Sequence, residues 1–235
     1  MTLNLKNLND WGVGSASSYC KLWIKDTTAA VIDIVGSRTL TISDTPTIKT
    51  AKDGQLYRDY GTTSFAYQYG DMGTDLNLTN QPFTISVWFN RTSTPAACGI
   101  IGMYEDNNNF LGVEYYTGSP ELDFECYSGG SWINISKTTT LTIPLNTWIH
   151  IVIARESSTS SPILYINGIR RTEFARTSGS DSFTCPNMSR YHHAVVNYAG
   201  TVHNAGGGIR NSMLFKGIAL TAGQVKALYN ATYIE

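Results

Sequence analysis

Charge is scarce in this sequence, and its two signs are balanced. Charged residues make up 15% of the 235 residues, whereas soluble domains have about 25%. The 17 Lys and Arg residues meet 18 Asp and Glu residues, for a net charge of −1. With no basic stripe or charged tail, we expect no nucleic-acid partner. The chain also has no apolar run of about 18 residues, so we expect no membrane insertion.

Cysteine is also sparse. The four cysteines (Cys20, Cys98, Cys126 and Cys185) lie far apart, and none stands at a CxxC or Cys/His spacing, so the sequence predicts no metal centre of that kind. The first ten residues lack the apolar segment and cleavage site of a signal peptide. We therefore expect synthesis in the cytoplasm and reduced thiols.

Residues that favour strands and turns are abundant. The sequence holds 28 Thr, 21 Ser and 17 Asn, with 42% apolar and 11% aromatic residues, a mixture that favours strands over exposed helices. Alternating apolar residues, separated by Gly, Asn, Asp and Pro, predict short strands. Their ranges are 21–25, 38–42, 63–69, 83–89, 98–104, 110–116, 121–126, 131–137, 148–154, 163–166, 169–171 and 208–219.

One helix is expected, over 221–230, where Thr221 and Gln224 match a capping box. The segment 176–206 lacks periodicity and is predicted to be a long surface loop, with a short strand near 194–198. The pattern predicts an all-β, two-sheet antiparallel jelly-roll sandwich with one short C-terminal helix. Residues 1–19 are interpreted as an N-terminal arm and residues 20–235 as a single domain.

Four blocks in order resemble laminin-G-like domains of the concanavalin-A-like lectin and glucanase superfamily. They are Phe83-Thr-Ile-Ser-Val-Trp-Phe89, Trp148-Ile-His-Ile-Val-Ile153, Leu164-Tyr-Ile-Asn-Gly-Ile169 and the segment from Gly217 to Tyr229. The resemblance covers roughly residues 20–232. It implies a jelly roll, a fold that carries adhesins, lectin-like modules, enzymes and viral surface proteins. It also implies that a Ca²⁺ ion could bind at the rim, where Asp106 is a weak candidate ligand and a plain hairpin turn is the alternative.

Alternation along three middle strands places acidic and aromatic side chains on one outward face. Strands 110–116, 121–126 and 131–137 are joined by short turns and are expected to be neighbours. Their outward residues are predicted to form one patch, made of Glu114, Tyr116, Glu121, Asp123, Glu125, Trp132 and Asn134.

Three interpretations of this patch remain open. Glu121-Leu-Asp-Phe-Glu125 resembles the E-x-D-x-E signature of jelly-roll glucanases, which implies Glu121 as nucleophile, Glu125 as acid and Asp123 as the residue tuning their pKa values. A glycan-binding face is the second, with Tyr116 and Trp132 stacking on sugars and Glu114, Asp123 and Asn134 accepting hydrogen bonds. The third is an ordinary solvated surface. The pair His192-His193 is expected to be exposed to solvent, and neither this pair nor His203 has a Cys or acidic partner at metal-ligand spacing.

These observations favour a non-enzymatic surface or structural module. Domains of this fold usually work outside cells, whereas the sequence begins without a signal peptide. Because a virion protein reaches the exterior by lysis, we hypothesise a virion surface protein, either a capsid decoration protein or a host-attachment adhesin. Its expected partners are other virion proteins or a host-surface glycan, as a homo-oligomer or in a larger assembly, and its expected place is the virion surface or, alternatively, the extracellular space. The alternative function is hydrolysis of a β-glucan by Glu121, Asp123 and Glu125. We expect no cofactor other than the Ca²⁺ ion considered above.

Overall fold

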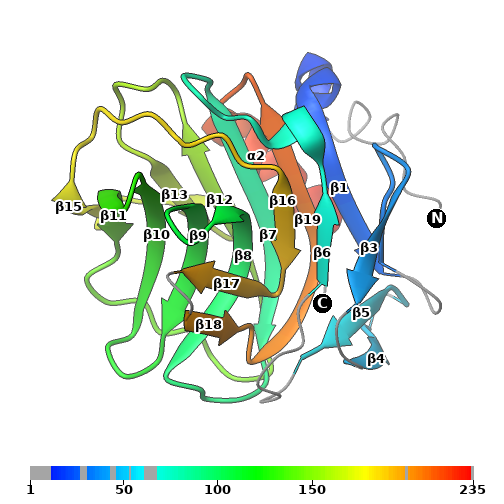
Figure 1. Cartoon of the computed structure of the whole chain (residues 1–235). Helices are drawn as coiled ribbons and strands as arrows, with labels where there is room; N and C mark the ends of the chain where they lie inside the picture. The colour runs from blue at the N-terminus through cyan, green and yellow to red at the C-terminus, as the bar shows by residue number, and fades with distance from the viewer. Residues whose placement is uncertain are drawn as a thin grey trace.

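The chain forms two antiparallel sheets packed face to face, followed by one short helix (Figure 1). The computed structural model describes residues 12–26, 31–42, 46–52, 54–60, 68–198 and 201–233. The predicted all-β sandwich and its C-terminal helix are confirmed. Residues 1–11 of the predicted arm and residues 63–67 of the predicted strand 63–69 lie outside the described residues.

The first sheet, sheet A, carries the helix on its outer face. Neighbouring strands pair in the order β14, β13, β12, β7, β19, β1, β2 and β3, and β5 pairs with both β19 and β4. The bounds are β14 (Ile169–Arg171), β13 (Ile163–Ile166), β12 (Trp148–Arg155), β7 (Phe83–Arg91), β19 (Gly207–Lys216), β1 (Cys20–Asp26), β2 (Val31–Asp33), β3 (Arg38–Ile42), β4 (Thr47–Thr50) and β5 (Leu56–Asp59).

The second sheet, sheet B, runs in the order β3, β6, β16, β8, β9, β10, β11 and β15. Strand β3 belongs to both sheets, because its first half pairs with β2 and its last two residues pair with β6. The bounds are β6 (Gln68–Asp71), β16 (Arg190–His193), β8 (Ala97–Asp106), β9 (Asn109–Tyr116), β10 (Glu121–Ser128), β11 (Ser131–Lys137) and β15 (Ala175–Gly179).

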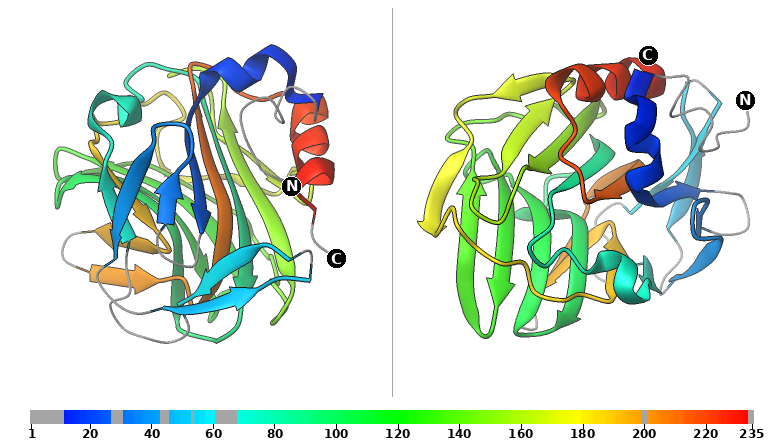
Figure 2. Two further views of the ribbon diagram at one scale, coloured as in Figure 1. Left: turned by 90° about the vertical axis from the view of Figure 1, so that its right-hand side faces the viewer. Right: turned by 90° about the horizontal axis from the view of Figure 1, so that it is seen from above.

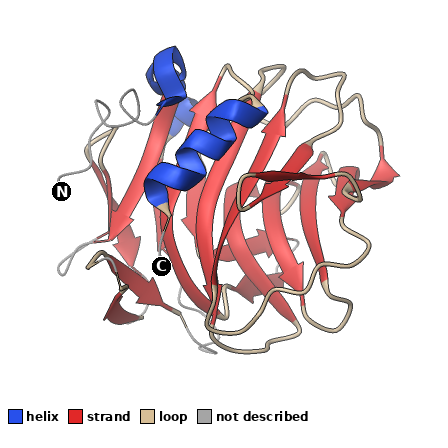
Figure 3. Cartoon of the chain, turned by 180° about the vertical axis from the view of Figure 1, so that it is seen from behind, coloured by secondary structure: helices blue, strands red, loops and turns tan. Residues whose placement is uncertain are grey.

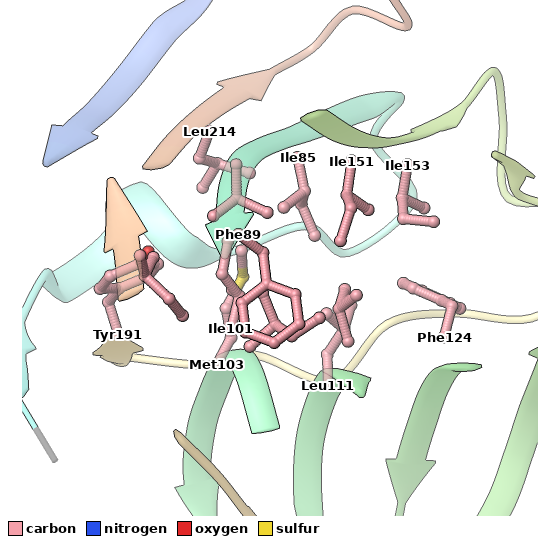
Figure 4. Close-up of a cluster of buried hydrophobic side chains, with 14 of the residues drawn as sticks. Ile85, Phe89, Ile101, Met103, Leu111, Phe124, Ile151, Ile153, Tyr191 and Leu214 are labelled. Atoms are coloured by element: carbon pink, nitrogen blue, oxygen red, sulfur yellow. The ribbon is translucent and has the colours of Figure 1, made fainter. Parts of the chain in front are cut away.

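The core between the sheets follows the predicted alternation. Ile85 and Phe89 of β7 lie in it with Ile151 of β12, and they face Leu111 and Phe124 of sheet B (Figure 4). Fully burying one such side chain contributes about 1.5–3 kcal/mol. All four cysteines are buried, and none is disulfide-bonded.

The outer face of sheet A is also covered. Helix α2 (Ala222–Thr232) and the 3₁₀ helix η2 (Gly14–Tyr19) lie against it (Figures 2 and 3). The predicted capping box is present, with Thr221 and Gln224 each bonding the other's backbone amide. Trp88 stacks against both His150 and Tyr229 of the helix, and these two rings also stack on each other with centroids 6.0 Å apart. No helix in the described ranges is long and apolar enough to span a bilayer.

The segment 176–206 is more ordered than predicted. It contains β16, which lies inside sheet B between β6 and β8, and the hairpin of β17 (Val195–Tyr198) and β18 (Thr201–Asn204). The expected short strand near 194–198 is thus confirmed as β17, whereas the surface loop is wrong for residues 176–179, 190–193 and 201–204, which belong to β15, β16 and β18. The other short helix, η3 (Gly73–Leu76), precedes β7.

Candidate functional site

Strands β9 and β10 bring most of the predicted patch together on the outer face of sheet B. Glu114 lies directly opposite Asp123, and Tyr116 lies opposite Glu121. Residues directly opposite each other in an antiparallel pair share a face. The predicted common face of these side chains is therefore confirmed, and Glu125 joins them two positions further along β10.

Asn134 does not belong to this face. A β-bulge interrupts the pairing of β10 and β11, so that Trp132 lies opposite Tyr127 while Asn134 lies opposite Cys126, on the core side. The Asn134 amide donates to the Ser180 carbonyl (2.8 Å), and its oxygen accepts from the Ser136 hydroxyl (2.8 Å). Its predicted outward position is wrong, because strict alternation cannot register the extra residue of the bulge.

The hairpin β17–β18 covers part of the same outer face (Figure 1). Two glycines make the close contact possible. A Cβ at Gly112 would lie 2.7 Å from Cγ1 of Val196, and a Cβ at Gly99 would lie 2.1 Å from the His203 carbonyl oxygen. The hairpin therefore rests on β8 through its backbone and on β9 through the Val196 side chain. Glu114 is fully buried beside it, whereas Tyr116, Glu121 and Trp132 are half-buried.

The three acids near this hairpin are withdrawn from solvent. Glu114 is fully buried, and Asp123 and Glu125 are 4% and 5% exposed. His203 of β18 lies 2.7 Å from the Glu114 carboxylate, and this hydrogen bond raises the pKa of His203. Within the described part of the chain, Oδ1 of Asp123 and Oε2 of Glu125 have no hydrogen-bond partner.

Burial shifts the acid equilibria of the cluster toward protonation. Desolvation, then the charge of Glu121, raises the pKa of Asp123 to about 7. Desolvation, then the charges of Glu114 and Asp123, raises the pKa of Glu125 to about 9. Desolvation disfavours the charged form of a carboxyl group. Glu125 therefore keeps its proton at neutral pH.

This arrangement bears on the glucanase interpretation. Glu121 is held by Lys137, whose ammonium lies 3.0 Å from its carboxylate, while Glu125 is enclosed. Glycoside hydrolysis needs two carboxyl groups on either side of a bond that the substrate can bring between them. One carboxylate here is in an ion pair and the other is enclosed, so the pair does not flank an open cleft.

An open pocket lies at the other end of this region, beside Trp132. Trp132 is half-buried and packs edge-on against Phe110 and Tyr127, with ring centroids 5.6 Å and 4.9 Å away. The pocket has a volume of about 400 Å³. Hydroxyl, apolar and glycine positions line it: Ser128, Trp132, Ile133, Gly179, Ser180, Ser182, Phe183 and Thr184.

Arg155 of β12 holds the far wall of this pocket in place. Its guanidinium lies 3.4 Å from the Phe183 ring centre and donates to the carbonyls of Ser158, Ser160 and Phe183. A buried cation that satisfies several carbonyls fixes the backbone that carries them. The wall residues 180–184 lie in the segment that is predicted to be a surface loop, so the sequence does not indicate this pocket. An aromatic residue, Phe183, within that otherwise polar segment is the one sign that part of it is buried.

The other polar candidates do not form a metal centre. Asp106 accepts hydrogen bonds from the Asn108 amide and the Asn109 side chain, as in a hairpin turn. No group of three or more His, Cys, Asp or Glu side chains in the described ranges is arranged to hold a metal ion. The predicted exposure of His192 and His193 is wrong: they are 6% and 0% exposed, and burial lowers their pKa values to about 4 and about 3.

Solved structures with a similar fold include domains that bind glycans. The chain superposes on the binding domain of botulinum neurotoxin DC in complex with SialylT with a TM-score of 0.68 and 14% identity, covering 93% of this chain and 53% of that one. It superposes on the binding domain of Paraclostridial Mosquitocidal Protein 1 with a TM-score of 0.70 and 17% identity, covering 92% and 53%. The chain thus spans about half the length of these two binding domains.

A third similar structure is matched over nearly its whole length. It is domain 4 of AbnA, a GH43 extracellular arabinanase from Geobacillus stearothermophilus, in complex with arabinotriose, with a TM-score of 0.66 and 18% identity, covering 89% of this chain and 98% of that one. No curated protein matches this sequence. At these identities the likeness shows the fold alone.

The sequence itself also matches a family model. The match covers residues 63–225, most of the chain, and the model describes the concanavalin A-like lectin/glucanases superfamily under the name Laminin_G_3. Its span includes β7, both strands of the acidic face, the hairpin over them and the Trp132 pocket. The chain therefore belongs to the Laminin_G_3 family of the concanavalin A-like lectin/glucanase superfamily.

Proposed function

We propose that this chain is a non-enzymatic glycan-binding module that holds a sugar in the Trp132 pocket. The observation that carries the proposal is a half-buried tryptophan beside an open pocket of about 400 Å³ ringed by Ser and Thr hydroxyls. Aromatic rings stack on the apolar faces of sugars, and hydroxyls exchange hydrogen bonds with their polar edges. The domains of similar fold that are in complex with SialylT and with arabinotriose support this class of ligand.

Tyr116 of the predicted binding face lies against the covered acids, where its ring meets His203 edge-on at 6.1 Å. Glu114 and Asp123 are buried beside it. We therefore assign sugar binding to Trp132. Tyr116, Glu114 and Asp123 are assigned a structural role, in the packing of the outer face of sheet B.

The test is a glycan array that includes sialylated and arabinan oligosaccharides, followed by titration of the best hit. Trp132→Ala is expected to weaken binding at least about tenfold, a loss of about 1.4 kcal/mol. Ile169→Ala is the matched control, since Ile169 is 65% exposed on the β13–β14 hairpin and does not line the pocket. Equal affinities of Trp132→Ala and the unmodified chain would refute the assignment.

The non-enzymatic part of the proposal has its own test. The enclosed Glu125 and the paired Glu121 support binding without turnover. The unmodified chain is incubated with a β-glucan and with an arabinan, and reducing ends are counted. If the unmodified chain releases reducing ends and Glu121→Gln does not, the hydrolase alternative is established and the proposal is overturned.

The setting we propose for this module is the surface of a virion, as a decoration protein or a host-attachment adhesin. The low-charge, Thr- and Asn-rich composition supports it, and the host-surface glycan would be the ligand. Co-sedimentation of the chain with intact particles tests the setting. A chain that stays in the supernatant of intact particles would exclude it while leaving glycan binding intact.

A further inference from the structure

A second pocket lies on the opposite side of the sandwich, on the outer face of sheet A beside the end of α2. It has a volume of about 350 Å³, within the range of about 300–1,000 Å³ typical of ligand sites. Tyr57 of β5, Trp148 of β12 and Tyr233 after α2 supply aromatic walls, and Asn90 and Asn146 supply amides. None of these residues belongs to the predicted patch.

Strand register builds the floor of this pocket. Trp148, Asn90 and Gly208 lie side by side on three neighbouring strands, β12, β7 and β19. A Cβ on Gly208 would lie 2.6 Å from the Tyr57 ring and 3.2 Å from the Trp148 ring. The missing side chain lets Tyr57 reach across and meet Trp148 edge-on, with centroids 4.9 Å apart. The two rings thereby form a corner of two apolar walls.

One polar group in this corner lacks a partner. Asn90 is 7% exposed, and its Oδ1 has no hydrogen bond within the described residues. An unpaired buried carbonyl is costly, and a ligand that brings a donor removes that cost. Asn146 is exposed at the rim of the pocket, in a turn where its backbone is left-handed (φ 56°). Its backbone N–H donates to the Arg91 carbonyl and holds this turn in place, and its side-chain amide lines the pocket.

We infer that this corner is a second sugar-binding site, which takes one neutral hexopyranose ring of a glycan. The ring's apolar face packs on Tyr57 and Trp148, and one hydroxyl donates to Asn90 Oδ1. At Asn90 a hydroxyl donor suits the site better than an anion, because the unpaired group is an acceptor. Lys52, which also lines the pocket, is exposed to solvent. The site lies on a different sheet from the Trp132 pocket, so each can bind without the other.

The test is saturation-transfer NMR and titration with methyl β-D-glucopyranoside, methyl β-D-galactopyranoside and methyl α-D-mannopyranoside. At least one is expected to bind in the millimolar range. Asn90→Leu is expected to weaken it about tenfold or more while the thermal unfolding midpoint stays equal or rises, because the unmatched carbonyl is gone. A structural role alone would instead lower the midpoint. Asn146→Gly keeps the left-handed turn and removes only the rim amide, and it is expected to weaken binding by a smaller factor.

Ile169→Ala is the control that is expected to leave methyl hexopyranoside binding unchanged, since Ile169 is 65% exposed and lines neither pocket. Trp132→Ala separates the two sites: it removes any binding in the sheet B pocket, and the binding that Asn90→Leu weakens is expected to persist in it. Loss of binding in Trp132→Ala with none in Asn90→Leu would overturn the second site and support the first. Absence of binding by all three glycosides at millimolar concentration would overturn the second site as well, whatever the array shows for longer glycans.

Discussion

Replacing Glu125 with Gln is expected to stabilise the protein at neutral pH and not in acid. The pKa of Glu125 is raised from 4.5 to about 9 in the folded chain. As pH rises above 4.5, the unfolded chain releases this proton while the folded chain retains it, so stability falls until about pH 9. The interval from 4.5 to pH 7, at about 1.4 kcal/mol per pH unit, places the deficit in the free energy of unfolding at pH 7 at about 3–4 kcal/mol.

Gln has the shape of the protonated carboxyl group and does not titrate, so it removes this deficit. The Gln amide also brings N–H donors that have no partner in the buried site, and these lower the free energy of unfolding by about 1 kcal/mol or more. We therefore expect Glu125→Gln to gain about 1–2 kcal/mol at pH 7 and to gain nothing, or to lose a little, at pH 4. Urea unfolding followed by tryptophan fluorescence at both pH values measures the difference.

Glu121→Gln is the matched control on the same strand. Glu121 makes an ion pair with Lys137 near the surface, and such pairs contribute about 0–1 kcal/mol. The free energy of unfolding of Glu121→Gln is therefore expected to be slightly lower than that of the unmodified chain at pH 7. The same stability difference for Glu125→Gln at pH 4 and pH 7 would refute the reasoning, since it would mean that the folded and unfolded chains bind this proton alike.

Three further substitutions test how the elements are held. Thr221→Ala removes the helix cap and should cost about 1 kcal/mol in urea unfolding; an unchanged midpoint would contradict it. Gly112→Val places atoms where Val196 packs, and overpacking of about 1–3 kcal/mol should speed hydrogen exchange of residues 195–198; equal exchange would show that the hairpin adapts. Arg155→Lys keeps the charge but loses the planar fork that reaches several carbonyls, so proteolysis within 180–184 should accelerate; an unchanged cleavage rate would assign that loop's order elsewhere.

The parts of the fold that the sequence predicts are those governed by local rules. The alternation of β7 and β12 predicts their inward rows, because one face of each strand packs against sheet B. The Asn167-Gly168 turn predicts its hairpin, since both residues adopt the left-handed backbone that it requires. The capping box likewise predicts Thr221 as the cap of α2, whose first helical residue is Ala222.

The misplaced residues each depend on a distant partner. Asn134 lies on the core side because one bulge after Trp132 shifts the alternation, and a bulge leaves no pattern within its own strand. The sequence predicts a loop at β16 because histidines stand where a buried strand usually has apolar residues. His192 nevertheless stacks on Tyr104, and His193 makes a hydrogen bond with Ser212. The covering of the acids could not be foreseen, because Gly99 and Gly112 do not reveal which segment they admit.

The positions of β16 and β19 have a consequence for synthesis on the ribosome. β16 fills the gap between β6 and β8 in one sheet, and β19 fills the gap between β1 and β7 in the other. Until residues 190–216 leave the exit tunnel, both sheets have unpaired inner edges of a kind that promotes aggregation. Pairings between segments so distant in the chain also form slowly. The nascent polypeptide must therefore stay soluble until residues 190–216 have emerged, and we expect chaperone supply to govern its yield more than the stability of the folded sandwich.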